Sequence, residues 1–328
     1  MINEKRLLDT FFDYVMIDSE TKNEKAMGEK LVENLKALGL EVKTDKAGEG
    51  FDSDGFNVCA YLPGTISGDP TIMCAHMDTV TPGNGIRPLV DDGIIHTDGS
   101  TILAGDDKSG IAAIMEAKEQ NIPCRNTEIL FTIGEEGGMN GVKNMDLSMI
   151  KGKEAMVFDA SGDIGKILTC GPGQIKIFAT IIGKSSHAGL APEEGISAIQ
   201  VAAKGIAKMN LLRIDEETTC NIGTLKAEYA TNIVPEKAEF VAEVRSRNLD
   251  KLNAQAAHMQ KCLQDACDEM GAKLEIELKT NYVSFNVEND DPIVQRVFES
   301  CKRLGYQAVT AKGGGGSDAN VMALHGIK

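Results

Sequence analysis

A histidine and an aspartate two residues apart are the first side chains in the sequence that point to chemistry. His76-Met77-Asp78 follows the apolar run Thr71–Ala75, which has the composition of a buried strand. Open α/β sheets place their ligand sites at the carboxyl ends of strands. Side chains alternate along an extended backbone, so His76 and Asp78 share one side and the carboxylate can orient the imidazole. A purely structural histidine–aspartate pair is the alternative interpretation.

Two further segments place pairs of carboxylates where an element begins or ends. Asp106 and Asp107 stand just before a helix-like run, where a helix N-cap is the ordinary explanation of one acid. Glu135 and Glu136 lie between glycines, directly after the apolar run 128–133. Adjacent carboxylates at the end of a buried strand fit a functional site better than a solvated surface.

A fourth segment completes the set, because Asp159 ends the apolar run 154–158. Two zinc ions about 3.5–4 Å apart require a bridging carboxylate and terminal nitrogen or oxygen ligands. A further carboxylate that stays off the metals can take a proton from the bridging water. The adjacent Glu135 and Glu136 supply both a ligand and such a base. The four segments together therefore predict a two-metal hydrolytic site.

The order and spacing of these motifs resemble the co-catalytic zinc peptidase family, which includes peptidase T, acetylornithine deacetylase and aminoacylase. The resemblance covers essentially the whole chain and is nearest to the peptidase T-like members. Five motifs carry it: Ala75-His76-Met77-Asp78-Thr79-Val80, Gly105-Asp106-Asp107-Lys108, Gly134-Glu135-Glu136-Gly137, Phe158-Asp159 and Ser186-His187-Ala188-Gly189.

The resemblance assigns a role to each candidate metal ligand. It implies that His76 and Asp159 bind one metal ion and that Asp106 bridges the two ions. Glu136 then binds the second ion, and the neighbouring Glu135 is the general base. The expected cofactor is a pair of zinc ions, with cobalt or manganese as substitutes.

The implied activity is the hydrolysis of short peptides by a di- or tripeptide aminopeptidase. In this enzyme Asp78 orients the histidine ligand, and Asp107 is a neighbour of the site.

An N-acyl-amino-acid amidohydrolase of the same family is the second candidate for the function. A non-catalytic peptide-binding relative is a third reading, because the family takes the last ligand of the second metal from a histidine near the C-terminus. That histidine is absent from the printed sequence, and His325 follows a helix-like run that makes it a poor replacement. If no metal were bound, several carboxylates would be buried at a high cost in free energy.

Three residues in the second half of the chain are implied to contact the substrate. His187 would steady the oxyanion of the tetrahedral intermediate, often in the partner subunit's site, and an ordinary loop histidine is the alternative. Asn232 and Arg245 lie in segments that look like the family's substrate-contacting segments. A guanidinium suits a peptide carboxylate, and a surface ion pair is an equal alternative for Arg245. The run Gly313–Gly316 resembles the family's glycine-rich loop, whose backbone N–H groups approach the substrate.

The elements that must position these residues alternate as in an α/β catalytic domain. Apolar residues recur at helical spacing over about 7–16, and a capping-box pattern from Thr21 to Glu24 predicts a second helix that ends at Gly39. A helix-like segment follows at 111–115. Short apolar runs predict the strands of a mixed, mostly parallel sheet: 56–62, 71–75, 128–133 and 154–158.

The pattern changes after residue 172 to the order β-α-β-β-α-β, which is the ferredoxin-like arrangement. The expected segments are strand 174–183, helix 195–209, strands 221–228 and 237–245, helix 252–267 and strand 273–279. We therefore predict a catalytic metal-binding domain from 1–172 and 290–328, with 173–289 as an inserted lid and dimerisation domain. The resemblance implies a homodimer through this lid.

The composition limits the classes of binding partner and the cellular compartment that we expect. Lys and Arg number 34 against 49 Asp and Glu, a formal net charge of −15, which opposes binding to a phosphate backbone. No apolar run approaches the roughly 20 residues of a membrane helix. The eight cysteines are scattered without C-x-x-C spacing, as expected of thiols in a reducing compartment. We expect a cytoplasmic protein that binds neither nucleic acid nor membrane.

Overall fold

The computed structural model describes residues 2–119 and 123–328. The chain forms two compact units, each with its own hydrophobic core. Unit 1 comprises Met1–Ile167, Asn289–Val309 and Ser317–Lys328, and unit 2 comprises Leu168–Glu288 and Thr310–Gly316. The catalytic and lid roles assigned to the two parts of the sequence stay predictions.

A five-stranded mixed sheet forms the centre of unit 1, in the order β1-β2-β6-β3-β7. Its strands are β1 (Glu41–Thr44), β2 (Val58–Leu62), β3 (Ile66–His76), β6 (Arg125–Thr132) and β7 (Glu154–Val157). The pairs β6–β3 and β3–β7 are parallel, whereas β1–β2 and β2–β6 are antiparallel. Three parallel strands thus end at one edge of the sheet, which is where such sheets bind ligands.

The register brings the ends of these three strands level. His76 lies opposite Thr132, and Cys74 lies opposite Val157. The part of β6 that precedes this edge, 128–132, is buried throughout, as is usual for a strand covered on both faces. Residues that follow the three strands therefore emerge side by side.

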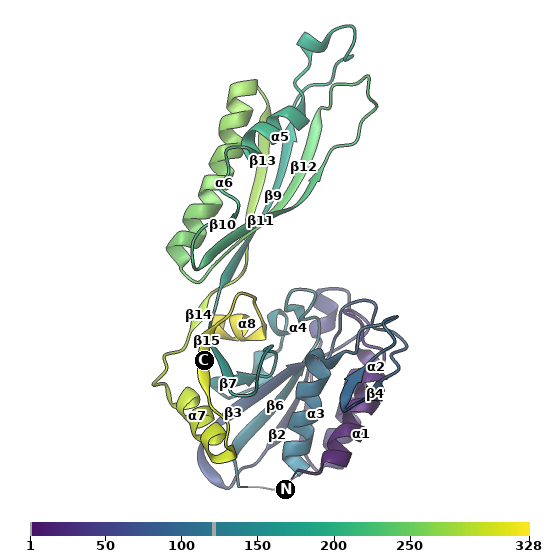
Figure 1. Ribbon diagram of the computed structural model, residues 1–328, viewed down its shortest axis with the longest axis vertical. Coiled ribbons are helices and arrows are strands. Elements are labelled where there is room, and N and C mark those ends of the chain that lie inside the picture. Colours follow the sequence, from purple (N-terminus) through teal and green to yellow (C-terminus); the bar gives the residue numbers. More distant parts are fainter. Residues whose placement is uncertain (1, 120–122) are drawn as a thin grey trace. The chain divides into compact units, whose positions relative to one another are not determined.

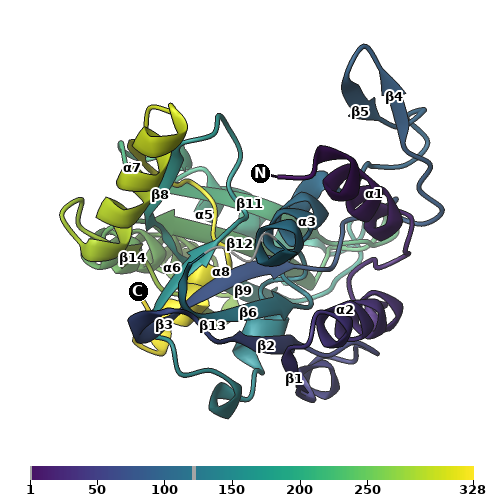
Figure 2. The same cartoon turned by 90° about the horizontal axis from the view of Figure 1, so that it is seen from below.

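Helices cover the sheet of unit 1 (Figure 2). α3 (Gly105–Glu119) packs against β3 and α1 (Glu4–Val15), and α2 (Lys25–Ala37) packs against β1 and β2. The predicted capping box at Thr21 is wrong, because α2 begins at Lys25 without a side-chain cap. The Thr21 hydroxyl instead donates a hydrogen bond to Asp78, and a charged acceptor makes the stronger bond.

The remaining elements of unit 1 lie outside its five-stranded sheet. They are the hairpin strands β4 (Leu89–Asp91) and β5 (Ile94–His96), the helices α4 (Asn140–Lys143), α7 (Pro292–Leu304) and α8 (Asp318–Leu324), and the 3-10 turns η1 (Ala47–Gly50) and η2 (Leu147–Met149). A separate three-stranded sheet, most of whose residues belong to unit 2, has the order β14-β8-β15. Its strands are β14 (Phe285–Asn286), β8 (Lys166–Gly171) and β15 (Val309–Lys312).

Unit 2 has an antiparallel sheet in the order β10-β11-β12-β9-β13, with two helices packed against it (Figure 1). Its elements are β9 (Gly173–Ile182), η3 (Pro192–Glu194), α5 (Ala198–Ile206), β10 (Leu212–Arg213), β11 (Thr218–Lys226), β12 (Lys237–Ser246), α6 (Leu249–Met270) and β13 (Lys273–Tyr282). Alternate residues of β9, such as Ile177 and Ile181, are fully buried in this core. The predicted ferredoxin-like order is confirmed, with β10 as an added edge strand.

Local sequence signals explain the longest helix. The side chain of Asn248 accepts a hydrogen bond from the backbone N–H of Lys251, which satisfies one of the free donors at the start of α6. Gly271 ends the helix with a φ of 73°, a left-handed conformation that glycine adopts without strain.

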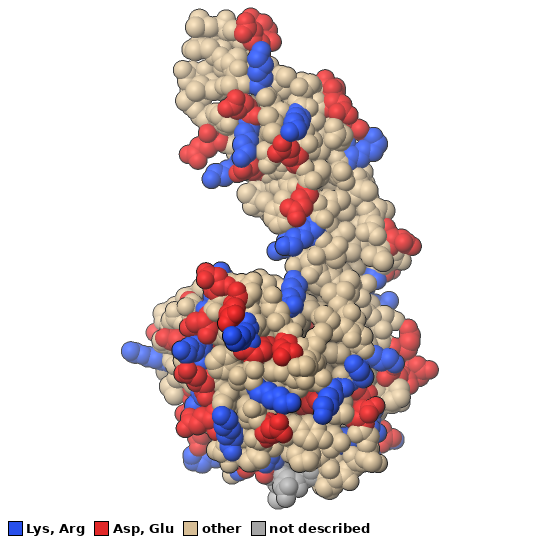
Figure 3. All heavy atoms as spheres, turned by 180° about the vertical axis from the view of Figure 1, so that it is seen from behind, with Lys and Arg blue, Asp and Glu red and all other residues tan. Residues whose placement is uncertain are grey.

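The surface carries charges of both signs. Figure 3 shows Lys and Arg side chains interspersed with Asp and Glu over the visible face of each unit. Within residues 2–119 and 123–328, no helix is both long and apolar enough to cross a membrane. The eight cysteines are free thiols, and all except Cys124 are buried.

Candidate metal centre

The carboxyl edge of the unit 1 sheet brings together the acids and the histidine that the sequence singles out. Among the described residues, two groups of three have potential ligand atoms that all lie within 4.8 Å of one another. The groups are His76 with Glu135 and Asp159, and His76 with Asp106 and Glu136. Because His76 belongs to both groups, the two sets of ligand atoms form one continuous cluster.

The members of the cluster lie at the end of a strand, shortly after one, or at the start of a helix. His76 is the last residue of β3, and Glu135 follows the end of β6 by three positions. Asp159 lies just beyond β7, where the backbone N–H of Phe158 still donates to the Cys74 carbonyl at 2.9 Å. Asp106 lies at the start of α3 with non-helical backbone angles, φ −85° and ψ 110°.

The imidazole of His76 is held at both nitrogens. Nδ1 lies 2.9 Å from the backbone carbonyl oxygen of Asp78 and 3.4 Å from its Oδ1, and Nε2 lies 3.0 Å from Asp106 Oδ1. A donor at Nδ1 leaves Nε2 as the nitrogen that can bind a metal. Burial lowers the pKa of His76, but the hydrogen bonds to Asp106 and Asp78 outweigh it and raise the pKa well above its usual value.

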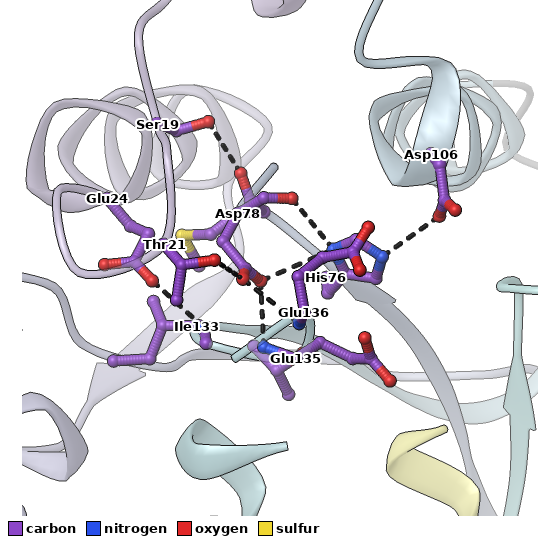
Figure 4. Close-up of polar contacts among 12 residues, drawn as sticks. Ser19, Thr21, Glu24, His76, Asp78, Asp106, Ile133, Glu135 and Glu136 are labelled. Carbon is purple, nitrogen blue, oxygen red and sulfur yellow. Dashed lines mark hydrogen bonds and ion pairs between the residues drawn. The ribbon is translucent and has the colours of Figure 1, made fainter. Parts of the chain in front are cut away.

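Asp78 connects three segments of unit 1 (Figure 4). Its fully buried carboxylate accepts hydrogen bonds from the backbone N–H groups of Glu135 at 2.9 Å and Glu136 at 3.2 Å. It also accepts one from the Thr21 hydroxyl at 2.8 Å. The residue therefore orients His76 and fixes the start of the segment that carries the two glutamates.

The carboxylates of the cluster are crowded enough to change their protonation. Burial, with Asp318 and Asp159 adding repulsion, raises the pKa of Glu135 to about 9. Burial also raises the pKa of Asp159 to about 7, and His76 opposes that rise. The pKa of Asp106 is lowered, chiefly by its hydrogen bond to His76. Buried carboxyl groups that lie close together resist ionisation, and a bound cation would favour their ionised forms.

Asp107 lies outside both groups, although it adjoins Asp106. Its side chain is buried, and its Oδ2 has no hydrogen-bond partner among the described residues. Burial raises its pKa to about 8. Gly110 leaves room for this carboxylate, since a Cβ there would lie 2.3 Å from Asp107 Oδ1.

Asp318 is a buried acid near the cluster that the sequence analysis missed. It begins α8, and its Oδ2 accepts a 2.6 Å hydrogen bond from the hydroxyl of Thr132, at the end of β6. Its Oδ1 is buried with no partner in the described part of the chain, and burial raises its pKa to about 6. The run Gly313–Gly316 just before it was the available signal. His325, at the other end of α8, lies outside both groups.

Comparison with known proteins shows which family the chain belongs to. Residues 172–271 match the M20 family model for a peptidase dimerisation domain. The chain is 42% identical to the uncharacterized protein YqjE of Bacillus subtilis over all of this chain and 89% of that protein. It is 25% identical to a peptidase T of Edwardsiella ictaluri over 98% of this chain and 88% of that protein.

Two crystal structures share the whole fold. A tripeptidase from Staphylococcus aureus is 39% identical with a TM-score of 0.96, covering 100% of this chain and 89% of its own. An aminopeptidase PepT from Bacillus cereus is 42% identical with a TM-score of 0.92, covering 99% and 89%. The chain belongs to the M20 peptidase family. The resemblance to peptidase T-like proteins is confirmed, and the protein is a peptidase.

In this M20 peptidase, two of the predicted substrate-contacting residues are neighbours in unit 2. His187 forms an isolated antiparallel bridge with Ile233, and the backbone N–H of Ala188 donates to the Asn232 carbonyl at 2.9 Å. Both His187 and Asn232 are exposed. Their roles toward a substrate stay predictions.

The structure shows what holds the third predicted residue, Arg245. Its guanidinium donates to both carboxylate oxygens of Glu243, at 2.8 and 3.1 Å, and Gln174 donates to the same carboxylate at 2.5 Å. The ion pair that the sequence left open is therefore present. Arg247, which the sequence analysis did not select, donates through Nη1 to the carbonyl of Gly313 at 3.5 Å and so contacts the glycine-rich loop.

Proposed function

We propose that this M20 peptidase is a metal-dependent aminopeptidase that removes the N-terminal residue of di- and tripeptides and uses two zinc ions. The observation that carries the proposal is the cluster of two ligand groups that share His76 within 4.8 Å. The likeness to a tripeptidase and to an aminopeptidase at about 40% identity supports the substrate class.

The donor set fits such a metal pair. One imidazole nitrogen and several carboxylate oxygens are ligands that zinc accepts, and cobalt and manganese accept them as well. In the proposal, His76 and Asp159 would hold one ion, Glu136 would hold the other, and Asp106 would be the ligand that both ions share. Glu135 also lies beside His76 and Asp159, and the proposal makes it the general base.

The residues of the chain supply the proton transfers. Bound metal ions would polarise the scissile carbonyl and lower the pKa of a water to about 7. The Glu135 carboxylate takes a proton from the attacking water and returns it to the leaving amine. Asp78 serves this step indirectly, because it fixes the backbone N–H of Glu135 and the orientation of His76.

Unit 2 contributes substrate binding and dimer formation in this proposal. His187 donates a hydrogen bond to the developing oxyanion, while Asn232 and Arg245 bind the peptide backbone and its terminal carboxylate. The match of residues 172–271 to a peptidase dimerisation domain supports a homodimer through this unit.

The test is hydrolysis of a tripeptide with three different residues by the purified protein, before and after chelation and after zinc is added back. Release of the N-terminal residue that stops with chelator and returns with zinc is the expected result. An N-acetylated copy of the same tripeptide should remain intact. Cleavage of N-acetyl amino acids in place of free peptides would replace the proposal with the amidohydrolase reading. Peptide cleavage that survives complete metal removal would contradict the metal mechanism.

A further inference from the structure

Four consecutive backbone N–H groups in unit 1 all donate to side-chain oxygens instead of to backbone carbonyls. The bonds are Ile133 to Asn57 Oδ1 at 3.1 Å, Gly134 to Glu24 Oε1 at 3.0 Å, Glu135 to Asp78 Oδ1 at 2.9 Å and Glu136 to Asp78 Oδ2 at 3.2 Å. Strand β6 ends at Thr132, so these groups have left the sheet and need other acceptors. Three fully buried side chains supply them.

The other carboxylate oxygen of Glu24 is also held by a hydrogen bond. Its Oε2 accepts a 2.7 Å hydrogen bond from the Ser53 hydroxyl. Its side chain packs so close to Gly55 that a Cβ there would lie 3.1 Å from Glu24 Cβ. A side chain that is held at both ends presents its acceptor to Gly134 with little freedom.

The backbone that Glu24 holds has a demanding conformation. Gly134 has a φ of 61°, and a Cβ at this position would lie 2.8 Å from the ring of Phe51. A left-handed residue directly before Glu135 sets the direction in which the chain leaves the strand. The hydrogen bond from Gly134 to Glu24 therefore holds the residue whose backbone angles set the direction of the segment.

Asn57 also forms hydrogen bonds that hold the same segment. Its Oδ1 accepts from Ile133, while its Nδ2 donates to the carbonyl of Gly141 at 2.9 Å and to Asp45 Oδ2 at 2.8 Å. The amide thus joins the start of the segment to Gly141, which follows the segment, and to Asp45, which precedes it in the chain.

We propose that Glu24, assisted by Asn57, is a positioning residue that fixes the backbone of 133–136 and through it the directions of the Glu135 and Glu136 side chains. The roles of those two glutamates rest on the proposed function. Charge-assisted hydrogen bonds are the stronger ones, and partners of this indirect kind are worth about 10–100-fold in activity or metal affinity. Glu24 itself belongs to neither of the two groups of potential metal ligands.

The experiment compares Glu24→Ala and Glu24→Gln with a matched control, Glu128→Ala. Glu128 is also a buried glutamate of unit 1 that accepts backbone N–H groups, those of Lys151 and Gly152, each at 2.8 Å. Amide hydrogen exchange of metal-free protein is measured by mass spectrometry over 133–138 and over 151–152. Thermal unfolding, bound zinc, kcat and KM for a tripeptide are measured on the same preparations.

Glu24→Ala should exchange faster over 133–138 and lower kcat by about 10–100-fold, with a smaller change in KM. Glu24→Gln should restore the exchange rates and most of kcat, because its amide oxygen accepts the same N–H. Glu128→Ala should exchange faster over 151–152 and keep the kcat of the wild type. If Glu24→Ala does not fold, the milder variant Ser53→Ala takes its place. It removes one of the hydrogen bonds that hold Glu24 and should make exchange over 133–138 faster.

Two results would overturn the proposal. One is unchanged exchange over 133–138 in the folded Glu24 and Ser53 variants. The other is a loss of kcat in Glu24→Ala no greater than in Glu128→Ala at an equal loss of thermal stability. A wild-type protein without peptide hydrolysis or zinc would refute the proposed function, while the exchange measurements would still decide whether Glu24 holds the segment.

Discussion

The backbone N–H of Glu135 donates a 2.9 Å hydrogen bond to the carboxylate of Asp78. The same carboxylate lies 3.4 Å from Nδ1 of His76, so one buried acid connects the end of β3 with the segment that follows β6. Asp78 therefore holds both the His76 imidazole and the segment that carries the proposed base, Glu135. Substitutions of His76 and of Glu135 should have separable effects on metal content and turnover.

Glu135→Gln should lower kcat for a tripeptide by about 10²–10⁴-fold, because an amide cannot take a proton from water. Bound zinc, measured by elemental analysis on the same sample, should stay at the wild-type level. Loss of zinc together with activity would make Glu135 a ligand, which its place beside His76 and Asp159 allows. Activity near that of the wild type would remove Glu135 from the mechanism.

His76→Ala should lose bound zinc and with it the hydrolysis of peptides, because His76 belongs to both ligand groups. His96→Ala is the matched control, since His96 also pairs with a carboxylate of unit 1, Asp91, at 2.7 Å. Zinc content should be unchanged in the control. A His76 variant that retains its full complement of zinc would contradict the ligand assignment.

The metal-free protein should become less stable as the pH rises from about 5 to about 9. The folded-state pKa values of Glu135, Asp107 and Asp159 are raised to about 9, 8 and 7. A carboxyl with a raised pKa favours the folded state while it is protonated in both states, and this contribution is lost as the pH passes through the folded-state value. The raised pKa of His76 acts in the same direction. Asp106, whose pKa is lowered, acts in the opposite direction at lower pH.

Thermal unfolding in chelator at the two ends of this pH range measures the effect. Glu135→Gln should reduce the difference between the two melting temperatures, because it removes the group with the highest of these pKa values. Zinc should also reduce the difference, since a bound cation favours the ionised carboxylates. Equal melting temperatures of the chelated wild type at both pH values would show that the cluster is not crowded as described.

Arg245→Ala should raise KM for a tripeptide by about 10–100-fold, the value of a charge-assisted hydrogen bond to a carboxylate. The same variant should change KM much less for the tripeptide C-terminal amide, which lacks that charge. Glu243→Gln, which weakens the ion pair and keeps the guanidinium, should preserve the preference for the free carboxylate. Equal effects of Arg245→Ala on both substrates would limit the residue to its pairing with Glu243.

His187→Ala should lower kcat while zinc content stays constant, because the proposed role is to stabilise charge in the transition state. Light scattering should show a dimer for the wild type and the variant. Mixing this variant with Glu135→Gln tests whether His187 acts across the dimer, since a mixed dimer would then contain one complete site. A monomeric wild type would exclude that arrangement, and an unchanged kcat would make His187 an ordinary loop residue.

Local pattern was enough to predict the strands that lead to the cluster and the order of elements in unit 2. Hydrophobic periodicity and turn residues depend on neighbours in the chain, so the strands that precede His76 and Asp159, and the β-α-β-β-α-β order of unit 2, could be predicted from the sequence. The sequence left an ion pair open for Arg245, and the structure supplies Glu243 as its partner, two residues away on the same face of the strand.

Only the tertiary structure decided which distant side chains support the site. Thr21 is 57 residues from Asp78, Glu24 is 110 from Gly134, and Asp318 is 186 from Thr132. Thr21 has the local pattern of a helix cap, and its hydroxyl bonds to a carboxylate from another element instead. Hydrogen-bond partners are chosen by distance and burial in the folded chain, and spacing along the sequence carries no record of either.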